Sequence, residues 1–183
     1  MRFPPPPAPM AEPVRPLLTE AEVAGRVEAV AAAIAPRVDD ETIAVCLLSG
    51  GLWFAADLTR ALHRLGRALL FDALWLESYG DARVTGGEVR MRAGLQRPVT
   101  GRQVLLIDEV IDSGLSLKVG RRLLREAGAA EVLTAVFARK PWDQARDIEP
   151  DFVAWEAPAR FLVGYGMDNA GAWRGLPDVA ALD

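Results

Sequence analysis

The sequence has little of the residues that most often carry nucleophilic or histidine-based catalysis. It contains one cysteine, Cys46, and one histidine, His63, among 183 residues. A lone cysteine excludes an intrachain disulfide framework and fits a reducing compartment, so we expect a cytoplasmic protein. A lone histidine gives little support to a Ser-His-Asp triad or to a metal site built from histidines. We therefore expect both residues to have structural roles.

Long apolar runs and an excess of basic charge are also missing. No stretch approaches the roughly 20 apolar residues that span a bilayer, so no membrane segment is expected. The net charge of -4 argues against a protein that coats nucleic acid, because such domains are usually basic. A chain of this length is sufficient for one domain with a sizeable core.

Proline is concentrated at the N-terminus, in "MRFPPPPAPMAEPVRP", which has seven prolines in sixteen residues and no apolar segment of a secretory signal. Because proline lacks the backbone donor that helices and sheets need, residues 1–16 are predicted to form an extended, disordered arm. A ligand for a proline-binding module is the alternative. Residues 17–183 then form a single domain.

Strand and helix patterns alternate along this domain. Thr19 and Glu22 have capping-box spacing, and apolar residues recur on one helical face until Pro36 ends the helix. Strands are predicted at 42–48, 67–76, 102–107 and 131–139, helices at 52–65 and 116–128, and two short strands in "DFVAW" and "RFLVGYG". Residues 77–102 are expected to form a long loop or a loose hairpin. This order predicts an α/β fold with a mainly parallel sheet.

Tryptophans fall in two kinds of segment. Trp53, Trp75 and Trp155 occur in apolar runs and are expected in the core, whereas Trp142 and Trp173 occur in loops and could line a pocket.

The segment "VLLIDEVIDSG" combines an apolar strand with three carboxylates, Asp108, Glu109 and Asp112, followed by Ser113 and Gly114. The helix that begins near Ser116 offers backbone N–H groups and a favourable dipole to an anion. A sugar phosphate would satisfy both parts, with its phosphate on the loop and its hydroxyls, or their Mg²⁺, on the acids.

Other interpretations of the same segment are open. Asp108 and Glu109 could simply mark the end of the strand, and Ser113 or Ser116 could be the N-cap of the helix, without any of them binding a ligand. "LLIDE" also resembles the Mg²⁺-binding strand of a P-loop ATPase, but the chain has no G-x-x-x-x-G-K-[ST] motif. "GYGMDNAG" lacks the G-x-G-x-x-G spacing of a dinucleotide-binding fold.

Taken whole, "VLLIDEVIDSGLSL" resembles the phosphoribosyl-pyrophosphate (PRPP) loop of the type I phosphoribosyltransferases. "LLSGGLWFAADLTRAL" is similar to the pyrophosphate loop and helix of the hypoxanthine-guanine enzymes of that family, and "ESYGD" to the start of their lid. "PDFVAWEAPARFLVGYGMDNAGAWRGLPDV" is similar to their purine-binding C-terminal part. The resemblance implies a twisted, mainly parallel sheet flanked by helices, with a small hood built from the N- and C-terminal parts.

The resemblance also implies a role for each matching residue. Asp112 would be the general base for the purine N7 proton, and the lid would begin at Ser78 and Tyr79. PRPP would be bound by Asp108, Glu109, Ser113, Gly114, Leu115, Ser116, Ser49, Gly50 and Arg174. The purine would be bound by Val110, Lys140, Phe161, Leu162 and Asp168. Asp108, Glu109 and Asp168 would hold Mg²⁺, and the family suggests a homodimer or homotetramer.

One position departs from the family pattern. The family usually has a lysine where Ser49 stands, in a peptide that contacts pyrophosphate and a neighbouring subunit. Ser49 supplies a hydroxyl without a charge. We therefore expect weaker PRPP binding than is usual in the family, and no coupling between subunits through this side chain. The backbone N–H groups of Gly50 and Gly51 can still bind pyrophosphate.

Three functions are compared. The first is purine salvage, in which hypoxanthine or guanine and PRPP give IMP or GMP and pyrophosphate, with small-molecule substrates and no nucleic acid or membrane partner. The second is a non-catalytic regulator of the same fold that senses PRPP or nucleotides; it is disfavoured because Asp112, Lys140 and Asp168 are all present and the chain is acidic. The third is an enzyme with a shifted preference for xanthine.

Overall fold

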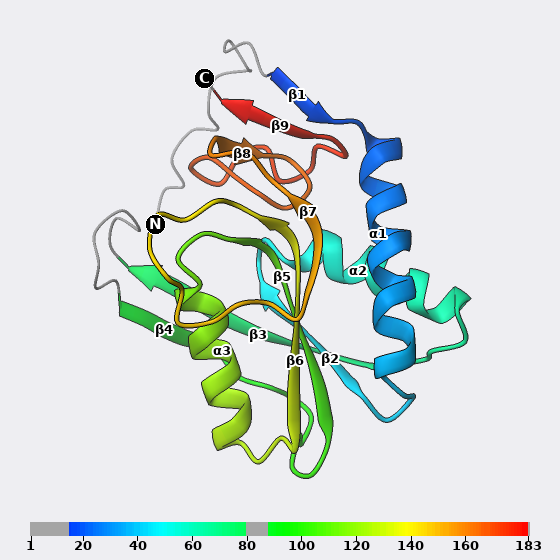
Figure 1. Ribbon diagram of the computed structural model, residues 1–183. Helices are drawn as coiled ribbons and strands as arrows, with labels where there is room; N and C mark the ends of the chain where they lie inside the picture. The colour runs from blue at the N-terminus through cyan, green and yellow to red at the C-terminus, as the bar shows by residue number, and fades with distance from the viewer. Residues whose placement is uncertain (1–14, 80–87, 183) are drawn as a thin grey trace, which may run out of the picture.

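The centre of the protein is a six-stranded sheet (Figure 1), seen in a computed structural model that describes residues 15–79 and 88–182. The strand order is β4-β3-β2-β5-β6-β7, in which β4 is antiparallel and every other neighbouring pair is parallel. The strands are β2 (Ile43–Leu48), β3 (Leu70–Tyr79), β4 (Glu88–Ala93), β5 (Gln103–Ile111), β6 (Glu131–Arg139) and β7 (Phe152–Glu156). The predicted α/β class with a mainly parallel sheet is confirmed.

Helices cover both faces of this sheet. Helices α1 (Glu20–Ile34) and α2 (Leu52–Arg64) pack on one face, and α3 (Leu115–Glu126) packs on the other. A short 3₁₀ turn, η1 (Ala35–Arg37), follows α1 at Pro36. The predicted capping box is present, because the Glu22 carboxylate accepts a 2.8 Å hydrogen bond from the Thr19 N–H.

Alternation along the strands divides the core into two layers. On β5, Leu105 and Ile107 pack with α1 and α2, whereas Val104 and Leu106 pack on the α3 side. All four side chains are fully buried, so the central strand is apolar on both faces, as expected for a covered parallel sheet.

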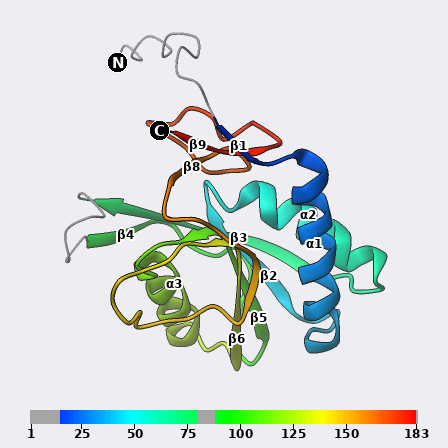
Figure 2. The same ribbon diagram turned by 45° about the horizontal axis from the view of Figure 1, so that its top comes forward.

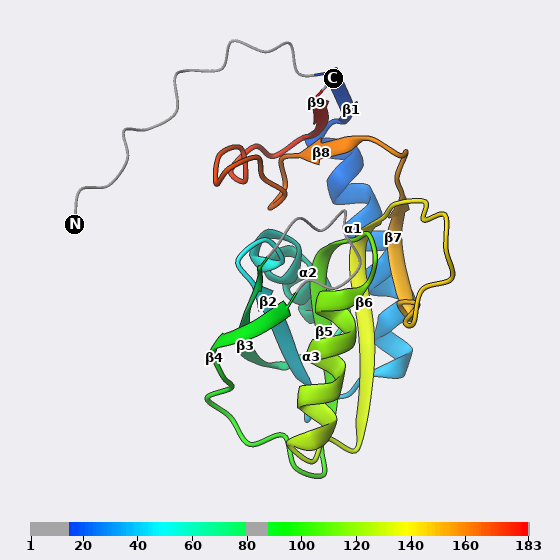
Figure 3. The same ribbon diagram turned by 90° about the vertical axis from the view of Figure 1, so that its left-hand side faces the viewer.

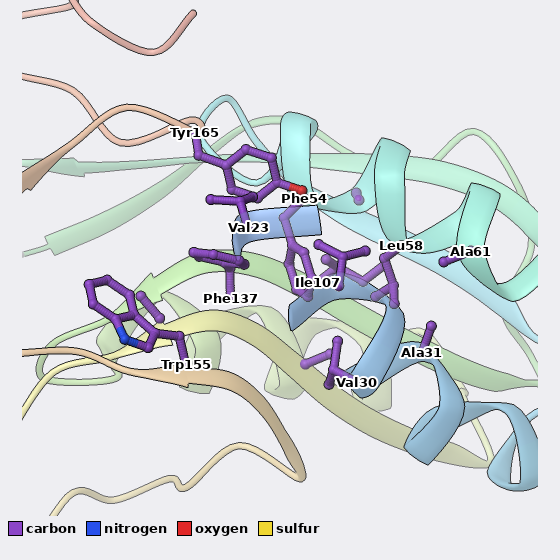
Figure 4. Close-up of a cluster of buried hydrophobic side chains, with 14 of the residues drawn as sticks. Val23, Val30, Ala31, Phe54, Leu58, Ala61, Ile107, Phe137, Trp155 and Tyr165 are labelled. Carbon is purple, nitrogen blue, oxygen red and sulfur yellow. The ribbon is translucent and has the colours of Figure 1, made fainter. Parts of the chain in front are cut away.

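Phe137 on β6 connects the sheet to the C-terminal part of the chain (Figure 4). Its ring lies 5.7 Å from that of Phe54 and 4.7 Å from that of Tyr165. The Tyr165 hydroxyl donates a 3.0 Å hydrogen bond to Asp57 on α2. Burial and the Asp57 charge raise the pKa of Tyr165, which keeps this hydroxyl protonated and able to donate. The segment after β8 is thereby held against α2.

A small second sheet stands over the main sheet (Figure 2). Its order is β1-β9-β8, with strands β1 (Arg15–Leu18), β8 (Phe161–Val163) and β9 (Val179–Leu182), all antiparallel. This is the predicted hood built from both ends of the chain. β1 begins at Arg15, inside the range predicted for the arm, and residues 1–14 lie outside the described residues.

Three local predictions need correction or completion. β5 was predicted to end at residue 107, but it continues to Ile111, because β6 extends alongside it as far as Arg139. Of the two alternatives for residues 77–102, the hairpin is present, since β4 pairs antiparallel with β3. Trp75 was expected in the core, yet it is 47% exposed.

In the described part of the chain, no helix has the length and apolar character to cross a membrane.

Candidate active site

The acidic pair follows the buried part of β5, between β2 and β6. Asp108 is 9% exposed, and its carboxylate accepts a 3.0 Å hydrogen bond from the Glu109 N–H. Burial, with the neighbouring charge of Glu109, raises the pKa of Asp108 well above its ordinary value. A cation or a hydroxyl donor beside this pair would offset that cost.

The loop after β2 passes directly over these acids. A Cβ at Gly50 would lie 1.8 Å from the Glu109 Oε1 atom, and one at Gly51 would lie 2.7 Å from the Leu47 carbonyl. Only glycine fits where two segments approach so closely. The peptide bond between Leu48 and Ser49 is cis, Ser49 is exposed, and Gly50 is buried.

The hood contributes a guanidinium to the same place. Figure 3 shows the segment between β8 and β9 extending over the start of α2. From this segment, Arg174 donates a 2.5 Å hydrogen bond to the Gly166 carbonyl and pairs with Asp168 at 2.6 Å. It also lies 4.0 Å from Glu109. A charge-assisted fork therefore faces the acidic end of β5.

The third acid of the loop has a different partner. The Lys140 Nζ atom lies 2.8 Å from the Asp112 Oδ1 atom, and both side chains retain some exposure, 19% and 45% respectively. The contact follows from the parallel register, because Ile111 is opposite Arg139 and the next residues are therefore neighbours. The Lys140 N–H also donates to the Ile111 carbonyl at 3.1 Å. A cation and an anion are thus paired at the end of β5 and β6.

Between Asp112 and α3 the backbone forms a tight turn. Gly114 has a φ of 83° and is the N-cap of α3, with no side-chain cap bond, so neither Ser113 nor Ser116 is the N-cap. Ser113 Oγ accepts a long hydrogen bond, 3.4 Å, from the Leu115 N–H. The turn therefore presents backbone donors at a helix N-terminus, next to the acids.

Comparison with known proteins agrees with this geometry. The phosphoribosyl transferase domain family matches residues 22–170. The hypoxanthine-guanine phosphoribosyltransferase of Bacillus subtilis is 35% identical over 167 residues, which cover 91% of each chain. The chain belongs to the hypoxanthine-guanine phosphoribosyltransferase family. The enzyme of that name from Aquifex aeolicus is 33% identical over 169 residues, 91% of this chain and 93% of that one.

A solved structure supports the same assignment of fold. The hypoxanthine phosphoribosyltransferase of Staphylococcus aureus superposes with a TM-score of 0.83 at 26% identity, covering 92% of this chain and 91% of that one. The resemblance to the phosphoribosyltransferases inferred from the sequence is thereby confirmed, together with the fold that it implied.

The remaining positions expected from the phosphoribosyltransferase pattern lie on strands. Phe161 begins β8 and is 44% exposed, whereas Leu162 is buried; Val110 on β5 is half-buried. Ser78 and Tyr79 end β3, where they pair with Val89 and Glu88, and their side chains lie outside the described residues. Residues 80–87, which belong to the expected lid, also lie outside them.

Two features of the site were not found from the sequence. Gly166 packs on the loop after β2, since a Cβ there would lie 2.1 Å from the Gly50 carbonyl. Arg146, in the segment between β6 and β7, donates to the main-chain carbonyls of both Asp112 and Lys140. Neither has a local sequence signal, because each acts through a contact with a distant segment.

Proposed function

We propose that the chain transfers the 5-phosphoribosyl group of PRPP to hypoxanthine or guanine, giving IMP or GMP and pyrophosphate in purine salvage. The observation that carries the base assignment is the 2.8 Å pair of Lys140 and Asp112. In a 6-oxopurine, O6 and N7 lie side by side on one edge of the base. An ammonium beside a carboxylate matches an O6 acceptor beside an N7 proton, whereas adenine would direct its amino group at the ammonium.

In this mechanism Asp112 takes the N7 proton while a ring nitrogen of the purine bonds to C1′ and the bond from C1′ to pyrophosphate breaks. The sugar passes through a cationic, oxocarbenium-like state that nearby carboxylates stabilise. Asp108 and Glu109 are assigned to the ribose hydroxyls. The 5′-phosphate is assigned to Ser113, Gly114, Leu115 and Ser116, and pyrophosphate to Ser49, Gly50 and Arg174. Arg174 suits that role because its fork can bind two oxygens at once.

The residues present fit a Mg²⁺ ion that is shared with the substrate. Mg²⁺ is usually held by one or two carboxylates together with substrate phosphates. Within residues 15–79 and 88–182 there is no group of three or more acidic, cysteine or histidine ligands. Asp108 and Glu109 would therefore hold one ion, and Asp168 would help to hold a second. The ion would neutralise the charge of the departing pyrophosphate.

The purine ring is assigned to the hood side of the site. Phe161, with its exposed ring, would stack on the base, while Leu162 and Val110 would contact it. Asp168 would lie near the exocyclic edge. Ser78 and Tyr79 would begin the lid that keeps water from hydrolysing the activated sugar.

A substrate competition assay tests this proposal. Purified protein is incubated with PRPP, Mg²⁺ and labelled hypoxanthine, guanine, xanthine or adenine, and the nucleotides are separated. We expect product with hypoxanthine and guanine, and none with adenine. Product with xanthine alone would replace the proposal by the shifted-preference alternative. No product with any base, together with retained PRPP binding, would favour the non-catalytic regulator.

Restoring the family's lysine at position 49 should strengthen binding of the sugar donor. We expect Ser49→Lys to lower the KM for PRPP by about three- to tenfold, because an ammonium would add a charge-assisted contact to pyrophosphate. Steady-state kinetics with PRPP varied would measure this. Ser49→Met, of similar length without charge, is the control. Equal KM values for all three proteins would show that backbone donors at Gly50 and Gly51 suffice.

We also propose a homodimer or homotetramer that buries an exposed part of β3. Phe71 and Trp75, four residues apart and therefore on the same face of this strand, are 41% and 47% exposed; Ala73, between them on that face, packs toward the α2 side. Large apolar side chains gathered on one strand face are typical of an interface.

Trp75→Glu is expected to shift the protein to monomer in sedimentation velocity. Leu65→Glu, at another exposed apolar site, controls for added charge, and an unchanged mass of Trp75→Glu would contradict the interface.

The reaction is assigned to the cytoplasm, with small-molecule substrates. Cys46 is buried on β2, and burial, with the charges of Asp108 and Glu109, raises the pKa of its thiol to about 12. A buried, protonated thiol is neither a nucleophile nor a disulfide partner. This fits a reducing compartment.

A further inference from the structure

We propose that Arg146 is the positioning residue that holds the base-binding pair, Asp112 and Lys140, in register. The inference rests on the roles proposed above for those two residues. Arg146 lies in the segment between β6 and β7, and its side chain is only 7% exposed. Burying a guanidinium this deeply costs free energy unless its N–H groups are hydrogen-bonded. Its hydrogen-bond partners therefore indicate which groups it positions.

Those partners are the main chains of the two base-binding residues. The Arg146 Nε atom donates a 2.6 Å hydrogen bond to the Asp112 carbonyl, and Nη2 donates to the Lys140 carbonyl. Because the guanidinium is rigid and planar, two such bonds set the separation of the two carbonyls. The side chains of the same two residues meet 2.8 Å apart. Arg146 therefore acts on the pair through their main chains, whereas the side chains of Asp112 and Lys140 are the groups assigned to the substrate.

A second layer of charge holds the guanidinium itself. Glu149 lies 3.2 Å from Arg146 and also 3.2 Å from Arg139, so one carboxylate bridges two guanidiniums. Arg139 pairs in turn with Glu156 across the β6–β7 edge at 2.6 Å, and this hydrogen bond raises the pKa of Arg139. The Arg146 guanidinium is thus linked through Glu149 and Arg139 to β6 and β7, the last two strands at one edge of the sheet.

The geometry separates a positioning role from general support of the fold. Arg146 bonds to the carbonyls of the residues that face the base, whereas pyrophosphate is assigned to Gly50 and Arg174, which lie on other segments. Loss of the Arg146 hydrogen bonds should therefore act on purine binding and turnover more than on PRPP binding. A role in stability alone would change the melting temperature. It would leave the ratio of the KM for purine to the KM for PRPP unchanged.

Arg146→Gln is the test, in kinetics with each substrate varied in turn. We expect kcat/KM for hypoxanthine to fall about 10- to 100-fold, as for loss of hydrogen bonds from a charged donor that positions reacting groups. The KM for PRPP should rise less, by no more than about threefold, since the hydrogen bonds of Arg146 go to Asp112 and Lys140 and reach the turn at Ser113 only through the Asp112 carbonyl. Arg146→Lys keeps the charge but can hold one carbonyl well at most, so it should show the same asymmetry in smaller measure.

Two comparisons make the result decisive. Arg122→Gln, which removes an exposed pair with Glu126 on α3, is the matched control and should behave as the wild type. Asp112→Asn in the same assay reports on the site itself. Full activity of Asp112→Asn would overturn the proposed base and with it this inference. Loss of activity in Asp112→Asn with wild-type kinetics in both Arg146 variants, or an equal rise of KM for both substrates, would overturn the positioning role alone. If Arg146→Gln does not fold, Arg146→Lys decides by the same criteria.

Discussion

Replacing Asp112 by asparagine is expected to reduce kcat for hypoxanthine by about 100- to 10 000-fold, the usual contribution of a positioned general base. The amide keeps the size of the side chain but cannot accept the N7 proton. The KM for PRPP should change by less than about threefold, because the donor is assigned to other residues. Steady-state kinetics, with isothermal titration of PRPP into the variant, would measure both quantities.

The control must remove an Asp–Lys pair without touching the chemistry. Asp147 pairs with Lys118 on α3 at 2.5 Å, and both side chains are largely exposed. Asp147→Asn should therefore keep wild-type kinetics, since exposed pairs contribute little. A rate for Asp112→Asn equal to that of Asp147→Asn would refute the assignment of Asp112 as base, whatever the product specificity of the enzyme.

The segment assigned to PRPP could be located from the sequence because it is local. The apolar run, the acids and the Ser-Gly of residues 104–114 are continuous, and each element has its own physical requirement. The position at which β5 ends could not be predicted in the same way. Residues 108–111 stay in the strand because β6 continues beside them, and the length of a neighbouring strand is a property of the assembled sheet.

The pairing of the two residues assigned to the purine edge depends on strand register, which the sequence pattern alone does not provide. Lys140 meets Asp112 because Ile111 is opposite Arg139 in the parallel pair β5–β6. Arg146 was missed for a similar reason, since its hydrogen bonds go to carbonyls that any residue would supply.

Strand β9, "VAAL", has too little β-branched or alternating character to be recognised, and pairing with β1 from the opposite end of the domain makes it a strand. Trp75 was misplaced because an apolar run on a strand does not reveal which part of a face its helix covers.

Replacing Gly166 by alanine is expected to lower both stability and PRPP binding, because it would separate the hood from the loop at Gly50 to which pyrophosphate is assigned. Gly166 has a φ of 97°, and a Cβ there would lie 2.1 Å from the Gly50 carbonyl. The backbone conformation alone costs about 1–2 kcal/mol for an L side chain. Displacement of the packed loop would add about 1–3 kcal/mol. Chemical denaturation and the KM for PRPP would measure the two effects.

Gly171 separates these contributions, because it has a similar φ of 85° but nothing lies within 4 Å of the Cβ that would be added. Gly171→Ala should therefore lower the free energy of unfolding only by the cost of the backbone conformation. Its KM for PRPP should not change, although Gly171 lies in the same segment of the hood. The difference between the two variants isolates the contact of Gly166 with Gly50. Since Gly50 lies against Glu109, and Arg174 faces Glu109 from the hood, a shift of that contact should reach the donor site directly. Equal losses of stability and an unchanged KM in both variants would mean that the hood does not help to form the pyrophosphate site.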